Sequence, residues 1–165
     1  MKVSQWSLIM QYFQACWVDF SSESLRELLM DRVTFGMNDI SESLATARDA
    51  GYREGSDEGF VEANGVKTEM RGIDNVINHY EDTYFNVADS HSTKIISFSI
   101  REPPQEPNKP YFYSICAEYV IEQKYLDGNT YRAKVVEFFF PSKTEGKIAI
   151  INRTYSKKVL SQGTM

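Results

Sequence analysis

Hydrophobic residues in the first half of the chain recur at the spacing of helices. Between residues 5 and 19 the apolar positions fall three or four apart, which indicates one helix face formed by Trp6, Ile9, Met10, Phe13 and Trp17. A second, shorter helix is predicted after Ser22, which can cap it, and it ends at Asp31. A third helix is predicted over 71–85, with a stripe of Ile73, Val76, Ile77, Tyr80 and Tyr84. His79 lies at the edge of that stripe, and we interpret it as a packing or surface residue.

The remaining segments alternate in the manner of strands. A strand-like run at 32–37 follows the second helix, a further helix is predicted over 41–51, and Asn64-Gly65 favours the two-residue turn of a hairpin. Four strands are predicted at 92–100, 111–126, 131–140 and 148–156, and the last three form an antiparallel meander. Helices that precede strands in this way predict an α+β domain, with the helices packed on one face of a curved antiparallel sheet.

Charge and composition narrow the classes of function. The 165 residues suffice for a single domain, and 18 Lys and Arg against 23 Asp and Glu give a net charge of −5, which argues against a nucleic-acid partner. Polar residues interrupt the N-terminal apolar positions and no run is long enough to span a membrane, so we expect a cytoplasmic protein without a signal peptide. Cys16 and Cys116 are interpreted as buried thiols, and a disulfide between them stays open.

Four segments together resemble the nuclear transport factor two-like superfamily, which includes SnoaL-like and ketosteroid isomerase-like proteins. They are QYFQACWVDFSSESLRELLMDRVTF, RGIDNVINHYEDTYF, GNTYRAKVVEFFF and EGKIAIINRTYS. The resemblance implies one domain over 1–165, with a cone-shaped cavity between sheet and helices that suits a small apolar metabolite. It also marks about 38–67 as an insertion, and we expect a short polar tail from about 157.

Three side chains are candidates for acid–base chemistry. His91 stands at the start of a strand, where the resemblance places a histidine facing the cavity; it is otherwise a solvent-exposed strand end. Glu137 lies between apolar residues of one strand face, where burial would suit a general acid or base, and the alternative is a solvated or dimer-interface carboxylate. Asp39 follows the first strand, as a catalytic aspartate or as the cap of the next helix.

The candidate ligand-binding residues follow from strand alternation and from the helix faces. One face of the strand 111–126 is more apolar than the other, so we expect that face to meet the helices. It places Tyr113 and Tyr119 toward the cavity. Arg153 on the last strand, Tyr80 on the third helix and Trp17 on the first complete the predicted lining. No motif for a nucleotide, a catalytic serine or a metal is present in the sequence, so we expect neither a cofactor nor a metal site.

Three functions remain open at this point. The first is a cofactor-free isomerase, cyclase or dehydratase that acts by proton transfer on a small apolar molecule. The second is a binding module without an acid–base pair, and the third is an assembly domain whose cone is filled by its own side chains. A solidly filled cone would contradict the first two, and in each case the exposed half of the sheet favours a homodimer.

Overall fold

The computed structural model describes residues 3–41, 66–101, 115–142 and 145–162. Its helices and helical turns are α1 (Val3–Phe13), η1 (Gln14–Val18), α2 (Ser22–Leu28), α5 (Ile73–Tyr80), η2 (Glu81–Phe85) and η3 (Ser90–Ser92). Its strands are β1 (Leu29–Asp39), β2 (Val66–Arg71), β3 (Lys94–Arg101), β4 (Ile115–Lys124), β5 (Thr130–Pro141) and β6 (Ile148–Ser161). The predicted α+β class is confirmed.

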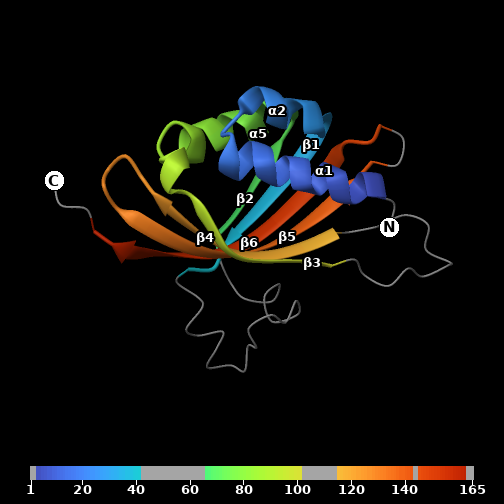
Figure 1. Ribbon diagram of the computed structural model, residues 1–165. Helices are drawn as coiled ribbons and strands as arrows, with labels where there is room; N and C mark the ends of the chain where they lie inside the picture. Colours follow the sequence, from blue (N-terminus) through green and yellow to red (C-terminus); the bar gives the residue numbers. More distant parts are fainter. Residues whose placement is uncertain (1–2, 42–65, 102–114, 143–144, 163–165) are drawn as a thin grey trace.

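The six strands form one curved sheet in the order β2-β1-β6-β5-β4-β3 (Figure 1). The predicted meander of β4, β5 and β6 is confirmed by their antiparallel pairing. The prediction of a wholly antiparallel sheet is wrong at one place, because β1 pairs with β6 in parallel. These two strands are far apart in the sequence, so no short turn fixes their relative direction and the hydrophobic pattern carries no signal for it.

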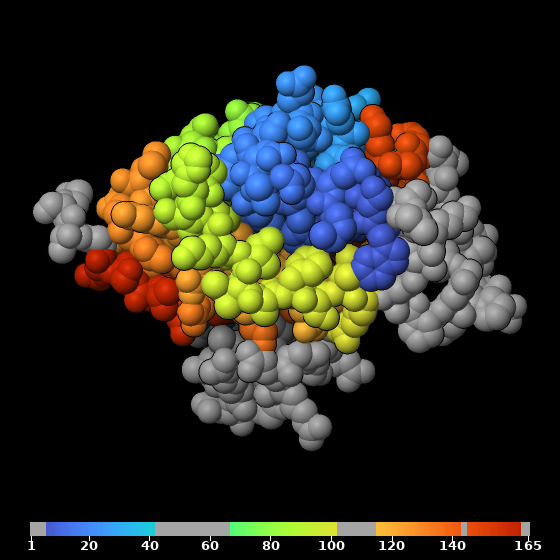
Figure 2. Space-filling model, in the orientation of Figure 1, coloured from blue at the N-terminus to red at the C-terminus, as the bar shows by residue number. Residues whose placement is uncertain are grey.

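The helices α1, α2 and α5 cover one face of the sheet (Figure 1), and the core lies between the two layers. The N-terminal helical segment sits directly above β3 (Figure 2), where the rings of Phe13 and Phe98 meet edge to face with centroids 4.9 Å apart. The predicted inward face of β4 is confirmed by the buried side chains Ile115, Ala117, Tyr119 and Ile121.

The inward face of the N-terminal helical segment agrees with the predicted stripe at Ile9, Phe13 and Trp17, which are buried, and differs from it at Met10. Met10 is 49% exposed, whereas Tyr12 is completely buried. The stripe that faces the sheet consists of Ile9, Tyr12, Phe13 and Cys16. Its spacing of i, i+3, i+4 and i+7 is as regular as the stripe read from the sequence, so periodicity alone did not decide between them.

The ends of several elements also shift. Ser21 caps α2, accepting a hydrogen bond from the backbone N–H of Ser24, and β1 begins at Leu29, before the predicted helix end. β6 pairs with β5 as far as Ser161, so the residues from 157 continue the sheet instead of forming a tail. Residues 42–65, with the predicted helix and the Asn-Gly turn, lie outside the described part. No helix within the described ranges has the length and apolar character needed to cross a membrane.

Candidate functional site

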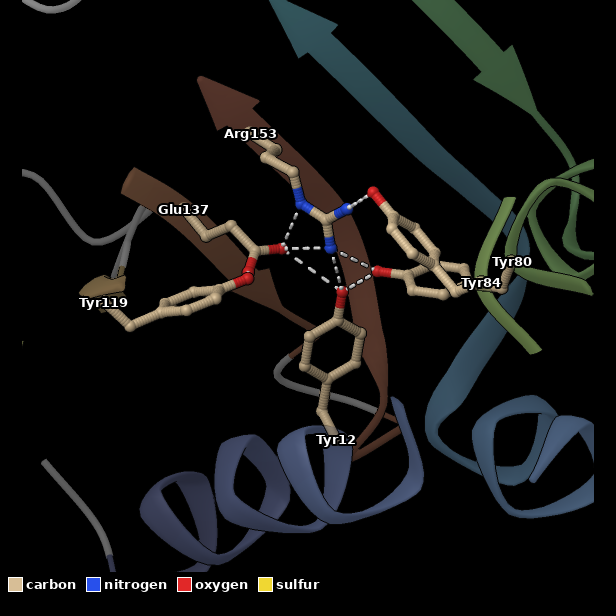
Figure 3. Close-up of polar contacts among 6 residues, drawn as sticks. All are labelled: Tyr12, Tyr80, Tyr84, Tyr119, Glu137 and Arg153. Atoms are coloured by element: carbon tan, nitrogen blue, oxygen red, sulfur yellow. Dashed lines mark hydrogen bonds and ion pairs between the residues drawn. The ribbon is translucent and has the colours of Figure 1, made fainter. Parts of the chain in front are cut away.

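A buried ion pair lies at the centre of the space between sheet and helices. Glu137 on β5 and Arg153 on β6 are register partners, and their side chains point toward the helices (Figure 3). Glu137 is completely buried and Arg153 is 2% exposed. Arg153 donates from Nε and Nη2 to Oε2 of Glu137, at 3.1 and 3.0 Å. Because both charges are removed from water, each depends on the other and on the polar groups around it.

Four tyrosine hydroxyls surround this pair, each from a different element (Figure 3). They belong to Tyr12 of α1, Tyr80 of α5, Tyr84 of η2 and Tyr119 of β4. Tyr119 donates to Oε1 of Glu137, and Tyr12 donates to Oε2 at 3.2 Å. Arg153 donates to the hydroxyls of Tyr80 at 2.6 Å, Tyr12 at 3.1 Å and Tyr84 at 3.2 Å, and Tyr12 and Tyr80 bond to each other. Helices and sheet are therefore joined through one polar network.

Two π-helical turns deliver aromatic residues to the network. In η1 the N–H of Asp19 bonds to the carbonyl of Gln14, and in η2 the N–H of Asn86 bonds to the carbonyl of Glu81, so each turn contains one extra residue. These turns carry Trp17 and Tyr84, whose rings meet edge to face at 5.0 Å. Insertions of this kind are frequent at functional sites because they redirect a side chain that a regular helix would point elsewhere.

The charge states of the network follow from burial. Burial raises the pKa of Tyr12 and Tyr119 well above the usual 10.0, and the Glu137 carboxylate raises it further. Burial alone would lower the pKa of Arg153, but the Glu137 carboxylate and the tyrosines raise it well above its usual value. The phenols therefore stay neutral hydrogen-bond donors while the guanidinium stays charged.

A small cavity adjoins the network on the side of β4, β5 and β6. It has about 20 Å³ open to the centre of a water molecule, which is room for about one water. Its buried inner wall includes Trp17, Tyr84, Gln123 and Arg153, and its partly exposed outer wall consists of Tyr125, Tyr131, Ala133, Tyr155 and Lys157. The open cone expected from the family resemblance is therefore largely occupied by the chain's own side chains, most of all by the tyrosines.

Lys157 is the second cation of the cavity wall. Its ammonium lies 4.3 Å from the ring centroid of Tyr125 and 4.5 Å from that of Tyr131, and it donates to the Tyr125 hydroxyl at 2.8 Å. Partial burial lowers the pKa of Lys157, and the charges of Asp39 and Asp127 oppose that shift. A cation held against two aromatic rings, with a lowered pKa, makes this wall a candidate for binding a charged or polar group.

Five of the residues proposed from the sequence meet in this region. Glu137 and Arg153 form its centre, and Tyr80, Tyr119 and Trp17 surround them. Three further residues were not proposed, namely Tyr12, Tyr84 and Lys157. The alternative stripe on α1 would have indicated Tyr12, and Tyr84 was already assigned to the packing face of its helix.

The other proposed residues lie elsewhere. His91 is exposed in the short turn η3, so it does not line the cavity and the predicted inward orientation is wrong. The turn is held by Asp89, whose carboxylate accepts from the His91 backbone N–H at 2.9 Å. Asp39 accepts from the Ser41 backbone N–H at 2.9 Å and from its hydroxyl, which forms a local turn outside the network. It also hydrogen-bonds to Tyr155, so it touches the cavity wall from outside without lining the cavity. Tyr113 lies outside the described residues.

No cluster of His, Cys, Asp and Glu with the arrangement of metal ligands occurs in the ranges that the structure describes. Cys16 and Cys116 are both buried, and no disulfide joins them to each other. The network and its cavity thus offer hydrogen-bond donors, two cations and one carboxylate. Such a set can bind and polarise an oxygen atom of a small molecule, and it can transfer a proton.

Comparison with known proteins supports the fold of the chain but does not identify its activity. No family model matches the chain, and no curated protein shows a significant sequence match. Solved structures do match. Hexachlorocyclohexane dehydrochlorinase (LinA) type 2 has a TM-score of 0.60 at 10% identity, covering 96% of this chain and 87% of that one. A candidate aromatic ring hydroxylase from Novosphingobium aromaticivorans has a TM-score of 0.60 at 13% identity, covering 98% and 92%.

A candidate isomerase from Bacillus subtilis has a TM-score of 0.56 at 12% identity, covering 93% of this chain and 86% of that one. At these identities the likeness establishes the fold alone. The α+β fold that the sequence resemblance predicted is therefore shared with these solved structures. A fold of this kind hosts many activities, so function has to be argued from the network and its cavity.

Proposed function

We propose that the chain is a cofactor-free enzyme of the isomerase or lyase type, acting by proton transfer on a small, mainly apolar molecule bound beside the Glu137–Arg153 network. The observation that carries this proposal is the network itself. A buried ion pair is often no better for stability than apolar side chains of the same size, because removing two charges from water costs as much as their attraction returns. A chain that keeps such a pair, with four phenols, in the middle of its core has a reason other than packing.

Tyr84 is the residue that this proposal places against the substrate. Its oxygen accepts from Nη1 of Arg153, which leaves its own O–H free to donate, and its ring lines the cavity. Burial raises the pKa of Tyr84, so its hydroxyl is protonated and available to a substrate oxygen. The neighbouring guanidinium strengthens the donor, since positive charge behind a phenol stabilises the negative charge that develops on the oxygen in front of it.

Glu137 takes the role of base in the same proposal, and Arg153 positions it. The carboxylate now accepts from the hydroxyls of Tyr12 and Tyr119, and none of these three residues lines the cavity. A substrate proton therefore reaches Glu137 only when the side chains between the cavity and the network move. The cavity is too small for a ring, for which about 150 Å³ is needed. Binding therefore requires the outer wall of partly exposed tyrosines to move, and that wall is the least buried part of the site.

Hydrogen exchange into small carbonyl compounds would test this activity without a known substrate. The protein is incubated in heavy water with cyclic ketones and enones, and deuterium uptake is followed by mass spectrometry. We expect exchange above the buffer rate, reduced about 100-fold in Tyr84→Phe, which removes one donor. Arg132→Met is the matched control, because Arg132 belongs to a partly exposed ion pair with Glu122, and it should retain full exchange. No exchange above buffer for any compound would contradict the proposal.

A second function is favoured by the near-complete filling of the cone. On that reading the chain is a non-catalytic module that acts as a homodimer through the sheet, and the network only joins helices to sheet. Sedimentation analysis tests it: a stable dimer together with no exchange activity would support this second function over the first. A monomer with exchange activity would exclude it.

A further inference from the structure

The cavity wall contains a buried hydrogen-bond donor that has no acceptor. Trp17 is 3% exposed, and its Nε1–H has no partner in the described structure. An indole N–H can only donate, and leaving such a donor unsatisfied costs about 1–3 kcal/mol. Because Trp17 lines the cavity, the acceptor it lacks belongs to whatever occupies that space.

Lys157, on the opposite side of the same cavity, lacks a partner of another kind. One of its three N–H groups donates to the Tyr125 hydroxyl, and the ammonium makes cation–π contacts with the Tyr125 and Tyr131 rings. Within the described ranges no carboxylate lies within ion-pair distance of its ammonium. Asp39 and Asp127 influence it only from farther away. The ammonium therefore has unused donors and no anionic partner among the residues that the structure describes.

Charge in the cavity wall has one sign. Among the described residues the wall contains two cations, Arg153 and Lys157, and no acidic residue, while Asp39 hydrogen-bonds to Tyr155 from outside the cavity. Glu137, which lies outside the cavity wall, neutralises the charge of Arg153, so Lys157 supplies the net positive charge of the wall. The outer wall around it is aromatic, with Tyr125, Tyr131 and Tyr155 partly open to solvent. Positive charge beside flat apolar surfaces is complementary to an aromatic carboxylate.

We infer that this cavity takes the carboxylate end of a small aromatic acid, with one oxygen accepting from Trp17 Nε1–H and the carboxylate paired with Lys157. The inference rests on the proposed function in that it names the substrate class of the same site. The cavity has room for about one water-sized group, so it takes one carboxylate oxygen, and the ring lies at the partly exposed mouth among the tyrosines. Lys157, on its flexible stem, moves together with the tyrosines of the outer wall to admit it.

The indole N–H of Trp17 gives a direct reading of this contact. The chain has two tryptophans, so the Trp6→Phe variant leaves a single indole N–H signal in an isotope-labelled spectrum. Benzoate is titrated into this variant, and benzamide, the neutral compound of the same shape, is titrated in parallel. We expect benzoate to shift the Trp17 signal and to bind at least about tenfold more tightly than benzamide, as one ion pair in a partly buried site allows.

Neighbouring lysines on opposite faces of β6 supply a matched pair of variants. Lys157→Met keeps the length and flexibility of the side chain and should fold, but it removes the charge. It should weaken benzoate binding at least about tenfold and leave benzamide unchanged. Lys158→Met, at an exposed position, should leave both unchanged.

The outcomes separate this inference from the proposed function. If benzoate shifts the Trp17 signal in a Lys157-dependent way and the protein catalyses no exchange, the ligand class stands and the enzymatic proposal fails. If exchange occurs on neutral ketones and benzoate binds no better than benzamide, the inference fails and the enzymatic proposal stands. A benzoate affinity unchanged by Lys157→Met, or a Trp17 signal that no probe moves, would also overturn the inference.

Discussion

Arg153 directs two donors, Nε and Nη2, at one oxygen of Glu137, Oε2. An isolated arginine and carboxylate would pair two donors with two oxygens. Here the second oxygen, Oε1, is occupied by the Tyr119 hydroxyl instead. The ion pair is thus one part of a larger arrangement, in which the carboxylate is shared between residues of the two neighbouring strands, Arg153 and Tyr119, and Tyr12 of α1.

Breaking this pair from one side should cost far more than removing both sides. Arg153→Met leaves a buried carboxylate without its cation and should lower the free energy of unfolding by about 3–5 kcal/mol. Glu137→Met should have a similar cost. The double variant should recover about 2 kcal/mol or more of the summed loss, because no charge is then left unpaired in the core. Urea unfolding midpoints of the four proteins give this coupling.

The partly exposed pair Arg132–Glu122 is the control for this cycle. Arg132→Met should cost no more than about 1 kcal/mol, because water screens that pair. Strictly additive losses for Glu137 and Arg153 would show that the two side chains contribute independently. The network would then be a set of separate packing contacts.

Sequence reasoning found the strand half of the network and only part of the helix half. The alternation of β4 put Tyr119 on the inward face, and the structure has it there. The alternation of β5 grouped Glu137 with apolar residues but left open whether that face is buried or solvated, and the structure buries it. Period two in a strand leaves only two choices of face, so one apolar set settles the question. Helix faces are less determined: Met10 and Tyr12 lie on adjacent stripes, and only the position of the sheet selects between them.

The remaining misses concern features without a local signal. Parallel pairing of β1 with β6 depends on contacts between distant segments, and π-helical turns at Trp17 and Tyr84 arise from packing rather than from residue type. His91 was placed by analogy with a family position. The short turn that Asp89 caps directs it to solvent instead.

Gly72 should be sensitive to substitution for a backbone reason alone. It joins β2 to α5 with φ of 90°, a conformation costly for residues with a Cβ, and an added Cβ would meet no atom within 4 Å. Gly72→Ala should therefore destabilise the protein by about 1–2 kcal/mol through strain and not through a clash. Gly36→Ala is the comparison, since its Cβ would meet only the exposed side chain of Asn152, at 2.9 Å, which can turn away. Equal losses in thermal unfolding would contradict the strain argument.

His79 should make the protein less stable in mild acid. Burial, and then the charge of Arg153, lowers the pKa of His79 from 6.5 to about 4. As the pH falls from 6.5 to about 4, the unfolded chain takes up a proton that the folded one does not, so stability is lost over this window. Because the ring is only partly buried, we expect a loss of about 1–2 kcal/mol rather than the full value of the shift.

Melting temperatures in neutral and mildly acidic buffer measure this dependence. His79→Phe should reduce its steepness, because phenylalanine keeps the contact with the Phe35 ring and cannot take up a proton. His91→Asn, at an exposed position, should leave it as in the unsubstituted protein. If His79→Phe and His91→Asn behave alike, the buried imidazole is not the source of the acid sensitivity.

The tyrosine network should set the alkaline limit of the fold. Burial raises the pKa of Tyr80 and Tyr119 well above 10.0, and it also raises the pKa of Tyr12 and of Tyr84. Above pH 10 the unfolded chain loses phenol protons that the folded chain keeps, so the stability present at neutral pH falls as the pH rises. These phenols should therefore ionise only together with unfolding.

Phenolate absorbance and far-ultraviolet circular dichroism, followed in one alkaline titration, test this coupling. The absorbance step that accompanies loss of structure should shrink by one tyrosine in Tyr80→Phe, because that phenol belongs to the protected set. Its remaining hydroxyl neighbours still have Arg153 as a partner, so the variant should fold. Ionisation of all tyrosines while the circular dichroism stays native would mean that hydroxide enters the space between sheet and helices. In that case the network would be open to solvent in the folded protein, and a ligand would need no movement of the tyrosine wall to reach it.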